Sequence, residues 1–168
     1  MLTNPETGDK KSLRRDSIIP ALSIIDPALM QTMPKSVLAS VGFDALCHTM
    51  EGFLSRSAQP MTDLLAREGM RCIAEHLPAL CEGADDPDAW DAVTWASTLG
   101  GMVIHTAGVT LPHGMEHPAS GIRNIVHGRG LAALTPIITD RSCDAAPERY
   151  AVISQTFGGK YSKTINGK

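Results

Sequence analysis

Residues 36–55, SVLASVGFDALCHTMEGFLS, decide the fold class of this chain. Val37, Val41, Ala45 and His48 recur in this stretch at spacings of three and four residues, which is the period of an α-helix. Similar patterns follow further along the chain, at residues 61–80, 89–105, 127–139 and 147–157. The sequence therefore predicts a mainly α fold, in which a bundle of helices buries its apolar faces.

Three local features add detail to this prediction. Residues 89–105 are apolar around much of the helix and contain several small residues, so we expect this helix in the middle of the bundle. Residues 111–130 predict two short helical pieces and a loop. Residues 17–25, SIIPALSII, form a short apolar run that indicates a buried or edge strand, although Pro20 interrupts it.

Composition limits the class of protein. The chain has 168 residues, the size of one ordinary domain, and a net charge of −3 without a long basic run, so nucleic acid is not an expected partner. Aromatic residues make up only 4%, so the core must be aliphatic, which suits helix packed on helix. The sequence contains no signal-peptide core, no membrane-length apolar stretch and no C-x-x-C pair. We expect a cytoplasmic protein with reduced cysteines and no membrane contact.

Four histidines and one aspartate are spaced as metal ligands often are. Asp44 and His48 are four residues apart in a predicted helix, so both side chains leave the same face. His113 and His117 repeat this spacing, and His127 precedes another predicted helix. Imidazoles together with a carboxylate suit Fe(II), Zn(II), Co(II) or Ni(II) better than Mg or Ca, which prefer oxygen ligands.

An ordinary structural role has to be weighed for each of these residues. A single histidine on a helix is more often a surface residue or a satisfied core residue, and His76 and His105 keep that interpretation. Asp44 differs because a carboxylate within an apolar helix is costly unless it is paired or binds a metal.

A zinc hydrolase is a competing hypothesis. Residues 113–117, HGMEH, match the H-x-x-E-H signature, in which Glu116 would be the general base. Gly114 and Pro118 are expected to shorten the helix that should display this motif. The downstream glutamate that should complete such a site has one candidate, Glu148. These features make the hydrolase the weaker alternative.

Four segments together resemble one enzyme family, the iron-containing (group III) alcohol dehydrogenases. They are residues 24–29 (IIDPAL), 42–51 (GFDALCHTME), 113–118 (HGMEHP) and 127–128 (HG). The likeness covers roughly residues 3–157, and the combination of these motifs is highly specific although neither main motif alone would be.

The resemblance implies a fold and a set of residue roles. The fold would be a helical bundle of the dehydroquinate synthase-like and iron alcohol dehydrogenase type, with a short β remnant at the N-terminus. Asp44, His48, His113 and His127 match the family's metal ligands. His117 matches a histidine that lines the catalytic cleft and is part of a proton path.

Further expectations follow from the same resemblance. Lys10 lies where the family often has a lysine beside the cofactor, Glu51 matches an acid with a supporting structural role, and Gly128 matches a residue that shapes a helix start. The implied activity is hydride transfer between a primary or secondary alcohol and NAD(P), or the reverse reduction of an aldehyde. Fe(II) would be the metal, with Zn(II) as the alternative, and a full-length family member would be a homo-oligomer.

The chain also departs from the family pattern. Family members are roughly twice as long and carry a glycine-rich phosphate turn in a nucleotide-binding domain, which is not found in this sequence. We therefore expect a truncated chain in which residues 1–25 are a remnant of the nucleotide-binding α/β domain. Residues 26–157 would be an incomplete helical metal-binding domain, and residues 158–168 a disordered or foreign tail. A non-catalytic metal-binding helical module remains the alternative from another class.

Overall fold

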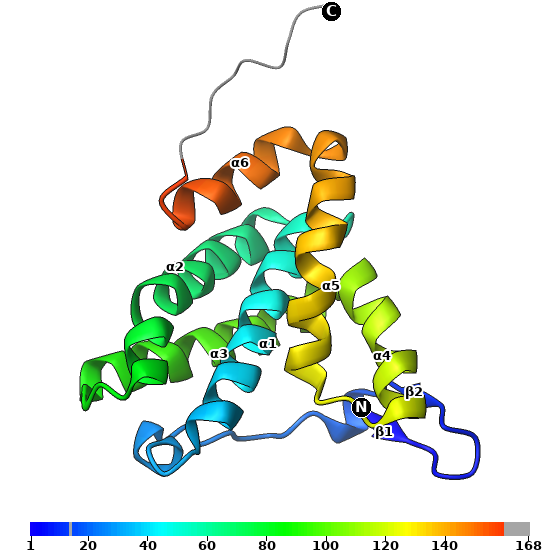
Figure 1. Cartoon of the computed structure of the whole chain (residues 1–168), viewed down its shortest axis with the longest axis horizontal. Coiled ribbons are helices and arrows are strands. Elements are labelled where there is room, and N and C mark those ends of the chain that lie inside the picture. Colours follow the sequence, from blue (N-terminus) through cyan, green and yellow to red (C-terminus); the bar gives the residue numbers. More distant parts are fainter. Residues whose placement is uncertain (14, 160–168) are drawn as a thin grey trace, which may run out of the picture.

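Helices dominate the computed structural model, which describes residues 1–13 and 15–159 (Figure 1). The α-helices of this part are α1 (Lys35–Leu54), α2 (Pro60–Glu82), α3 (Pro87–Ala107), α4 (Leu111–Arg123), α5 (His127–Ser142) and α6 (Pro147–Thr156). The smaller elements are β1 (Leu2–Thr3), β2 (Lys10–Lys11), η1 (Asp16–Ile18), η2 (Pro27–Met30) and η3 (Cys143–Ala145). The predicted mainly α fold with a short β segment is confirmed. The tail expected at residues 158–168 lies outside the described residues from residue 160 onward.

The helices form two groups that share α1. Helices α1, α2 and α3 pack on one another, while α5 lies against α1 and pairs with α4 (Figure 1). Helix α6 contacts both α1 and α2. Among the residues described, none of the helices is both long and apolar enough to cross a membrane.

Proline and capping residues determine where the long helices begin. Pro60 and Pro87 occupy the first turns of α2 and α3, where a missing N–H costs no hydrogen bond. The Asp86 carboxylate accepts hydrogen bonds from two backbone N–H groups of α3, at 3.0 and 3.1 Å. At its other end α2 stops at Gly83, whose φ of 104° favours glycine. Because these signals are local, the predicted ends of both helices agree with the structure to within two residues.

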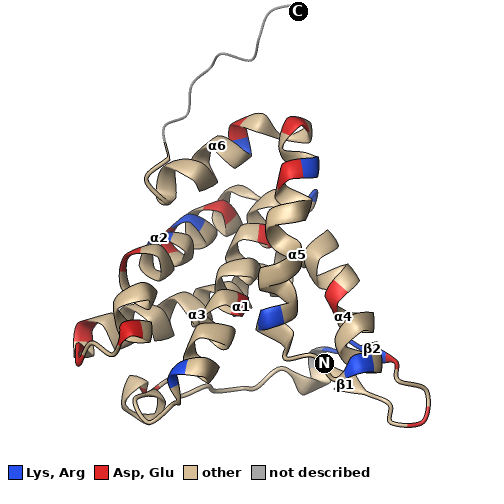
Figure 2. Ribbon diagram, in the orientation of Figure 1, with Lys and Arg blue, Asp and Glu red and all other residues tan. Residues whose placement is uncertain are grey.

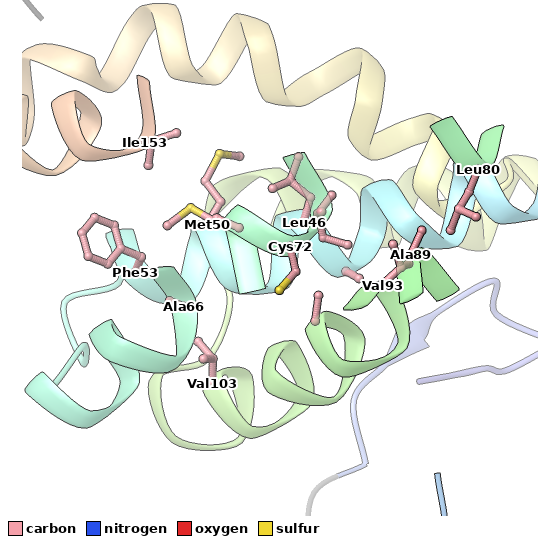
Figure 3. Close-up of a cluster of buried hydrophobic side chains, with 14 of the residues drawn as sticks. Leu46, Met50, Phe53, Ala66, Cys72, Leu80, Ala89, Val93, Val103 and Ile153 are labelled. Atoms are coloured by element: carbon pink, nitrogen blue, oxygen red, sulfur yellow. The ribbon is translucent and has the colours of Figure 1, made fainter. Parts of the chain in front are cut away.

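The core joins α1, α2, α3 and α6 (Figure 3). Leu46 and Phe53 of α1 meet Cys72 of α2, Val93 of α3 and Ile153 of α6 in one apolar cluster, and each is at most 8% exposed. Burying a large aliphatic or aromatic side chain contributes on the order of 1.5–3 kcal/mol. This cluster fixes α1 in position, so the opposite face of α1 can hold polar residues in a defined geometry.

The helix expected in the middle of the bundle, α3, lies to one side of it. Trp95 and Met102 are each 49% exposed on the outer face of α3. Gly100 is on the packed face, where an added Cβ would lie 3.3 Å from the Ala45 carbonyl oxygen, whereas Gly101 faces open space. The central helix is α1, which contacts α2, α3, α5 and α6. The sequence does not distinguish Gly100 from Gly101, but only Gly100 supports a close contact between helices.

The strand predicted at residues 17–25 is wrong. The 3-10 helix η1 ends at Ile18, and residues 19–25 form no regular element. Leu22 and Ile24 are 78% and 86% exposed. Pro20 lacks the backbone N–H that a strand would donate to its neighbour. In the described part of the chain the sheet consists of β1 and β2, and residues 17–25 pair with neither strand.

The β-hairpin at the N-terminus docks on α4. Strands β1 and β2 pair antiparallel, with Leu2 opposite Lys11 and Thr3 opposite Lys10. A Cβ on Gly121 of α4 would lie only 2.3 Å from the carbonyl oxygen of Gly8, so the absence of a side chain permits this contact. Figure 2 shows the basic residues of β2 beside α4. The hairpin therefore brings Lys10 to the helix that also carries His113 and His117.

Candidate metal centre

Four side chains from three helices converge on one point. Helix α1 presents Asp44 and His48 on one face, α4 presents His113, and α5 begins with His127. The Nε2 atoms of His48, His113 and His127 lie 3.3, 3.2 and 3.6 Å from the Oδ1 atom of Asp44. The structure thus brings together the four residues that the sequence predicts as metal ligands.

The atoms that meet at this point form a donor set for a cation. Asp44 Oδ1 and His113 Nε2 are buried and have no hydrogen-bond partner in the described part of the chain. Glu51 Oε1 lies 2.6 Å from His113 Nδ1, so we infer that Nδ1 keeps its hydrogen and that Nε2 presents the lone pair when His113 is neutral. Glu116 contacts His127 Nδ1 in the same way. Imidazole lone pairs around one carboxylate oxygen fit a divalent ion such as Fe(II) or Zn(II).

Glu51 connects this centre to the start of α4. Its side chain is 1% exposed, and Oε2 accepts hydrogen bonds from the Thr110 backbone N–H at 2.7 Å and the Thr110 hydroxyl at 3.2 Å. The other oxygen holds His113. The positive end of the α4 dipole and these donors compensate the buried charge. This geometry agrees with the supporting role predicted for Glu51.

The electrostatics of the centre favour a bound positive charge. Burial alone would lower the pKa of His113, but the carboxylates of Asp44 and Glu51 outweigh it and raise that pKa to about 9. Burial would raise the pKa of Asp44, but His113 and the other imidazoles hold it below its ordinary value. Burial lowers the pKa of His48. His113 therefore holds a proton at neutral pH when no metal is bound.

His117 borders the same centre as a neutral imidazole. Its ring centroid lies 5.4 Å from that of His113 and 5.3 Å from that of His127. Burial, followed by the charges of His113, His127 and Lys10, lowers the pKa of His117 to about 4. Its Nε2 atom is buried without a hydrogen-bond partner in the described part of the chain. His117 therefore stays neutral near neutral pH, beside the four converging side chains.

A cleft of about 1690 Å³ opens onto these side chains. Lys10 and His117 line it together with apolar residues such as Ile19 and Met102, so it offers both polar and apolar contacts. Two groups of side chains have ligand atoms within 4.8 Å of one another and could hold a metal: Asp44, His48 and His113, and His113, His117 and His127. His105 also reaches the wall of the cleft, but it belongs to neither group. His76 lies on α2 beside Glu75, away from the cleft.

Helix α4 differs from its prediction in a way that bears on the hydrolase hypothesis. It is one continuous helix from Leu111 to Arg123 with Pro118 inside it, so the motif at residues 113–117 is displayed on a helix after all. However, Glu116 is fully buried and contacts His127 Nδ1. A general base must face the cleft, so this geometry argues against the hydrolase.

Known proteins resemble this chain in sequence and in fold. A model of the Fe-containing alcohol dehydrogenase family, C-terminal part, matches residues 38–167. The chain is 34% identical to 1,3-propanediol dehydrogenase of Klebsiella pneumoniae over 158 residues, which cover 94% of this chain and 41% of that protein. It is also 34% identical to lactaldehyde reductase of Escherichia coli over 142 residues, 84% of this chain and 37% of that protein.

Solved structures give the same result. An archaeal halo-thermophilic alcohol dehydrogenase from a Red Sea brine pool superposes with a TM-score of 0.90 at 29% identity, covering 99% of this chain and 42% of that chain. An iron-containing alcohol dehydrogenase of Thermotoga maritima gives a TM-score of 0.74 at 35% identity, covering 80% and 37% of the two chains. The chain therefore spans about 41% of the length of a curated relative such as the Klebsiella enzyme. By sequence and by structure, it belongs to the Fe-containing alcohol dehydrogenase family.

Proposed function

We propose that this chain carries the metal centre of a metal-dependent alcohol dehydrogenase or aldehyde reductase. The observation that carries the proposal is the convergence of Asp44 Oδ1 with the Nε2 atoms of His48, His113 and His127. The names of relatives supply the reaction class. They include 1,3-propanediol dehydrogenase, lactaldehyde reductase and the NAD-dependent methanol dehydrogenase of Bacillus methanolicus, which is 30% identical over 147 residues. The proposed reaction is hydride transfer between a small alcohol or aldehyde and NAD(P).

Each residue of the centre has a defined task in this proposal. Asp44, His48, His113 and His127 hold Fe(II) or, as the alternative, Zn(II). The bound ion would lower the pKa of an alcohol hydroxyl, so that an alkoxide can form near neutral pH. His117 lines the same cleft as the four ligands and is our candidate for the residue that passes the released proton towards solvent.

The remaining assignments are also proposals. Lys10 lines the cleft and is our candidate for a contact with NAD(P). Residues 26–157 would form the metal-binding domain, and residues 1–25 would belong with a nucleotide-binding domain.

Metal analysis tests the proposed centre directly. The chain would be purified without oxygen and without chelators, and its iron and zinc content measured. We expect about one iron or zinc ion per chain, since the four donor atoms surround one point. A chain that is folded by circular dichroism but holds neither metal, even after incubation with Fe(II) or Zn(II), would refute the proposal.

The affinity for metal should rise with pH. His113 must release a proton before its Nε2 atom can bind a cation, and without metal its pKa is about 9, above its ordinary 6.5. We therefore expect the affinity for Zn(II) to increase about tenfold per pH unit between about pH 6.5 and 8.5, levelling off near pH 9. Competition with a chromophoric chelator, corrected for the chelator's own protonation, measures this slope. An affinity that is flat over this range would show that His113 is not a ligand that must be deprotonated.

A further inference from the structure

A buried polar cluster lies behind His127, on the side that faces away from Asp44. Glu116 is 0% exposed, and its Oε2 atom contacts His127 Nδ1. Lys10 Nζ lies 3.7 Å from the same carboxylate oxygen, 3.3 Å from His127 Nδ1 and 2.7 Å from Ser120 Oγ. The cluster thus joins β2, α4 and α5, and the proposed reaction leaves the carboxylate of Glu116 without a task.

Two glycines provide the space that this cluster occupies. A Cβ on Gly130 of α5 would lie 2.7 Å from Glu116 Cγ and 2.9 Å from Glu116 Oε1. A Cβ on Gly121 of α4 would lie 2.3 Å from the carbonyl oxygen of Gly8 and 3.2 Å from Lys10 Cβ. Gly130 therefore admits the carboxylate between α4 and α5, and Gly121 admits the hairpin that carries the lysine.

We propose that Glu116 is the positioning residue of His127 and that Lys10 is the counter-ion of Glu116. Glu116 accepts the hydrogen of His127 Nδ1, which leaves the lone pair on Nε2, the atom that faces Asp44. Lys10 donates a hydrogen bond to Ser120, and its charge balances a carboxylate that would otherwise be buried without compensation. This inference rests on the proposed metal centre and adds residues that act through one of its ligands.

The opposite side of the centre has a matching arrangement. Glu51 holds His113 at Nδ1, just as Glu116 holds His127. Two buried carboxylates therefore each direct one imidazole towards Asp44. A carboxylate at the outer nitrogen fixes both the orientation and the tautomer of a metal-binding imidazole, and removing it typically weakens metal binding about 10–100-fold.

Binding of Co(II) to the whole chain tests the inference, because Co(II) reports the ligand field through its visible absorption. We expect Glu116→Ala to bind Co(II) about 10–100-fold more weakly than the wild type and to show an altered visible spectrum. Glu116→Gln should recover most of the affinity and the wild-type spectrum, because its amide oxygen still accepts the hydrogen of His127 Nδ1. The inference is overturned if all three proteins bind alike, or if the glutamine variant binds as weakly as the alanine variant.

A glycine pair provides a second test that leaves every polar residue in place. Gly130→Ala should weaken Co(II) binding because the added methyl displaces the Glu116 carboxylate. Gly114→Ala on α4 is the matched control, since its Cβ would have nothing within 4 Å. Equal Co(II) affinity in the two glycine variants contradicts the positioning role. This pair decides the question if either Glu116 variant is unfolded by circular dichroism.

Different results would refute the metal centre and the positioning role of Glu116. A wild-type chain that binds no Co(II) refutes the metal centre, and the positioning role with it. A wild-type chain that binds Co(II), with unchanged affinity in Glu116→Ala, Gly130→Ala and Lys10→Met, refutes the positioning role alone. For Lys10→Met we expect a smaller loss than for Glu116→Ala, because the hydrogen bond from His127 to Glu116 remains.

Discussion

Replacing Asp44 with alanine should abolish binding of a divalent metal by this chain. Asp44 supplies the oxygen on which three imidazole nitrogens converge, at 3.2 to 3.6 Å. It is also the only one of the four proposed ligands that carries a negative charge. Its loss should therefore exceed the roughly 10–100-fold effect of losing a residue that only orients a ligand. We expect the metal content to fall from about one ion per chain to nearly none in protein purified anaerobically.

An exposed carboxylate on another helix provides the control for this substitution. Asp91 lies on the outside of α3, so Asp91→Ala should keep the wild-type metal content. The far-ultraviolet circular dichroism of Asp44→Ala should match the wild type, because the apolar core lies on the other face of α1. A folded Asp44→Ala chain that retains one metal ion would remove Asp44 from the ligand set.

Gly128→Ala should destabilise the fold and weaken metal binding together. Gly128 is the second residue of α5, and its added Cβ would lie 1.9 Å from the Ser40 carbonyl oxygen of α1. Alanine favours a helix by up to about 1 kcal/mol relative to glycine. The clash outweighs this gain because the neighbour is backbone, which no rotamer change can move, and overpacking usually costs about 1–3 kcal/mol or more. We expect a net loss of roughly 2 kcal/mol or more in the free energy of unfolding, measured by urea denaturation without metal.

The effect on metal binding follows from the position of His127. This proposed ligand directly precedes Gly128, so a shift of α5 away from α1 also moves His127 Nε2 away from Asp44. The matched control is Gly101→Ala in α3, where a Cβ would have nothing within 4 Å and the substitution should be neutral or slightly stabilising. Equal unfolding midpoints for the two alanine variants would show that the contact between α5 and α1 is looser than the structure indicates.

Local signals in the sequence were enough to predict most helices and to place Asp44 and His48 on one helical face. Pro60, Pro87 and Gly83 mark helix ends through backbone chemistry that does not depend on the rest of the fold. The spacing of Asp44 and His48 places both on one helical face for the same reason. The resemblance supplied the other partners, His113 and His127, because only tertiary contacts bring α4 and α5 to α1.

Features that depend on tertiary packing could not be predicted. The sequence assigned the central position to α3, because a small residue on the packed face and one facing solvent are indistinguishable before the helix is docked. Pro118 was expected to end a helix, yet α4 continues through it. Glu116 looked like part of a hydrolase motif, since its contact with His127 depends on how closely α4 and α5 approach each other at Gly130.

The metal centre would also act as a cross-link within the chain. The four cysteines, all within the described part, are free, so no disulfide joins α1 to the pair of helices α4 and α5. A metal ion held by Asp44, His48, His113 and His127 would fasten that pair to α1 reversibly, and it would bind only the folded arrangement. Each tenfold gain in metal affinity then adds about 1.4 kcal/mol to the stability of the fold at saturating metal. The supply of the metal would thus determine how firmly α4 and α5 are fastened, as well as whether the centre is occupied.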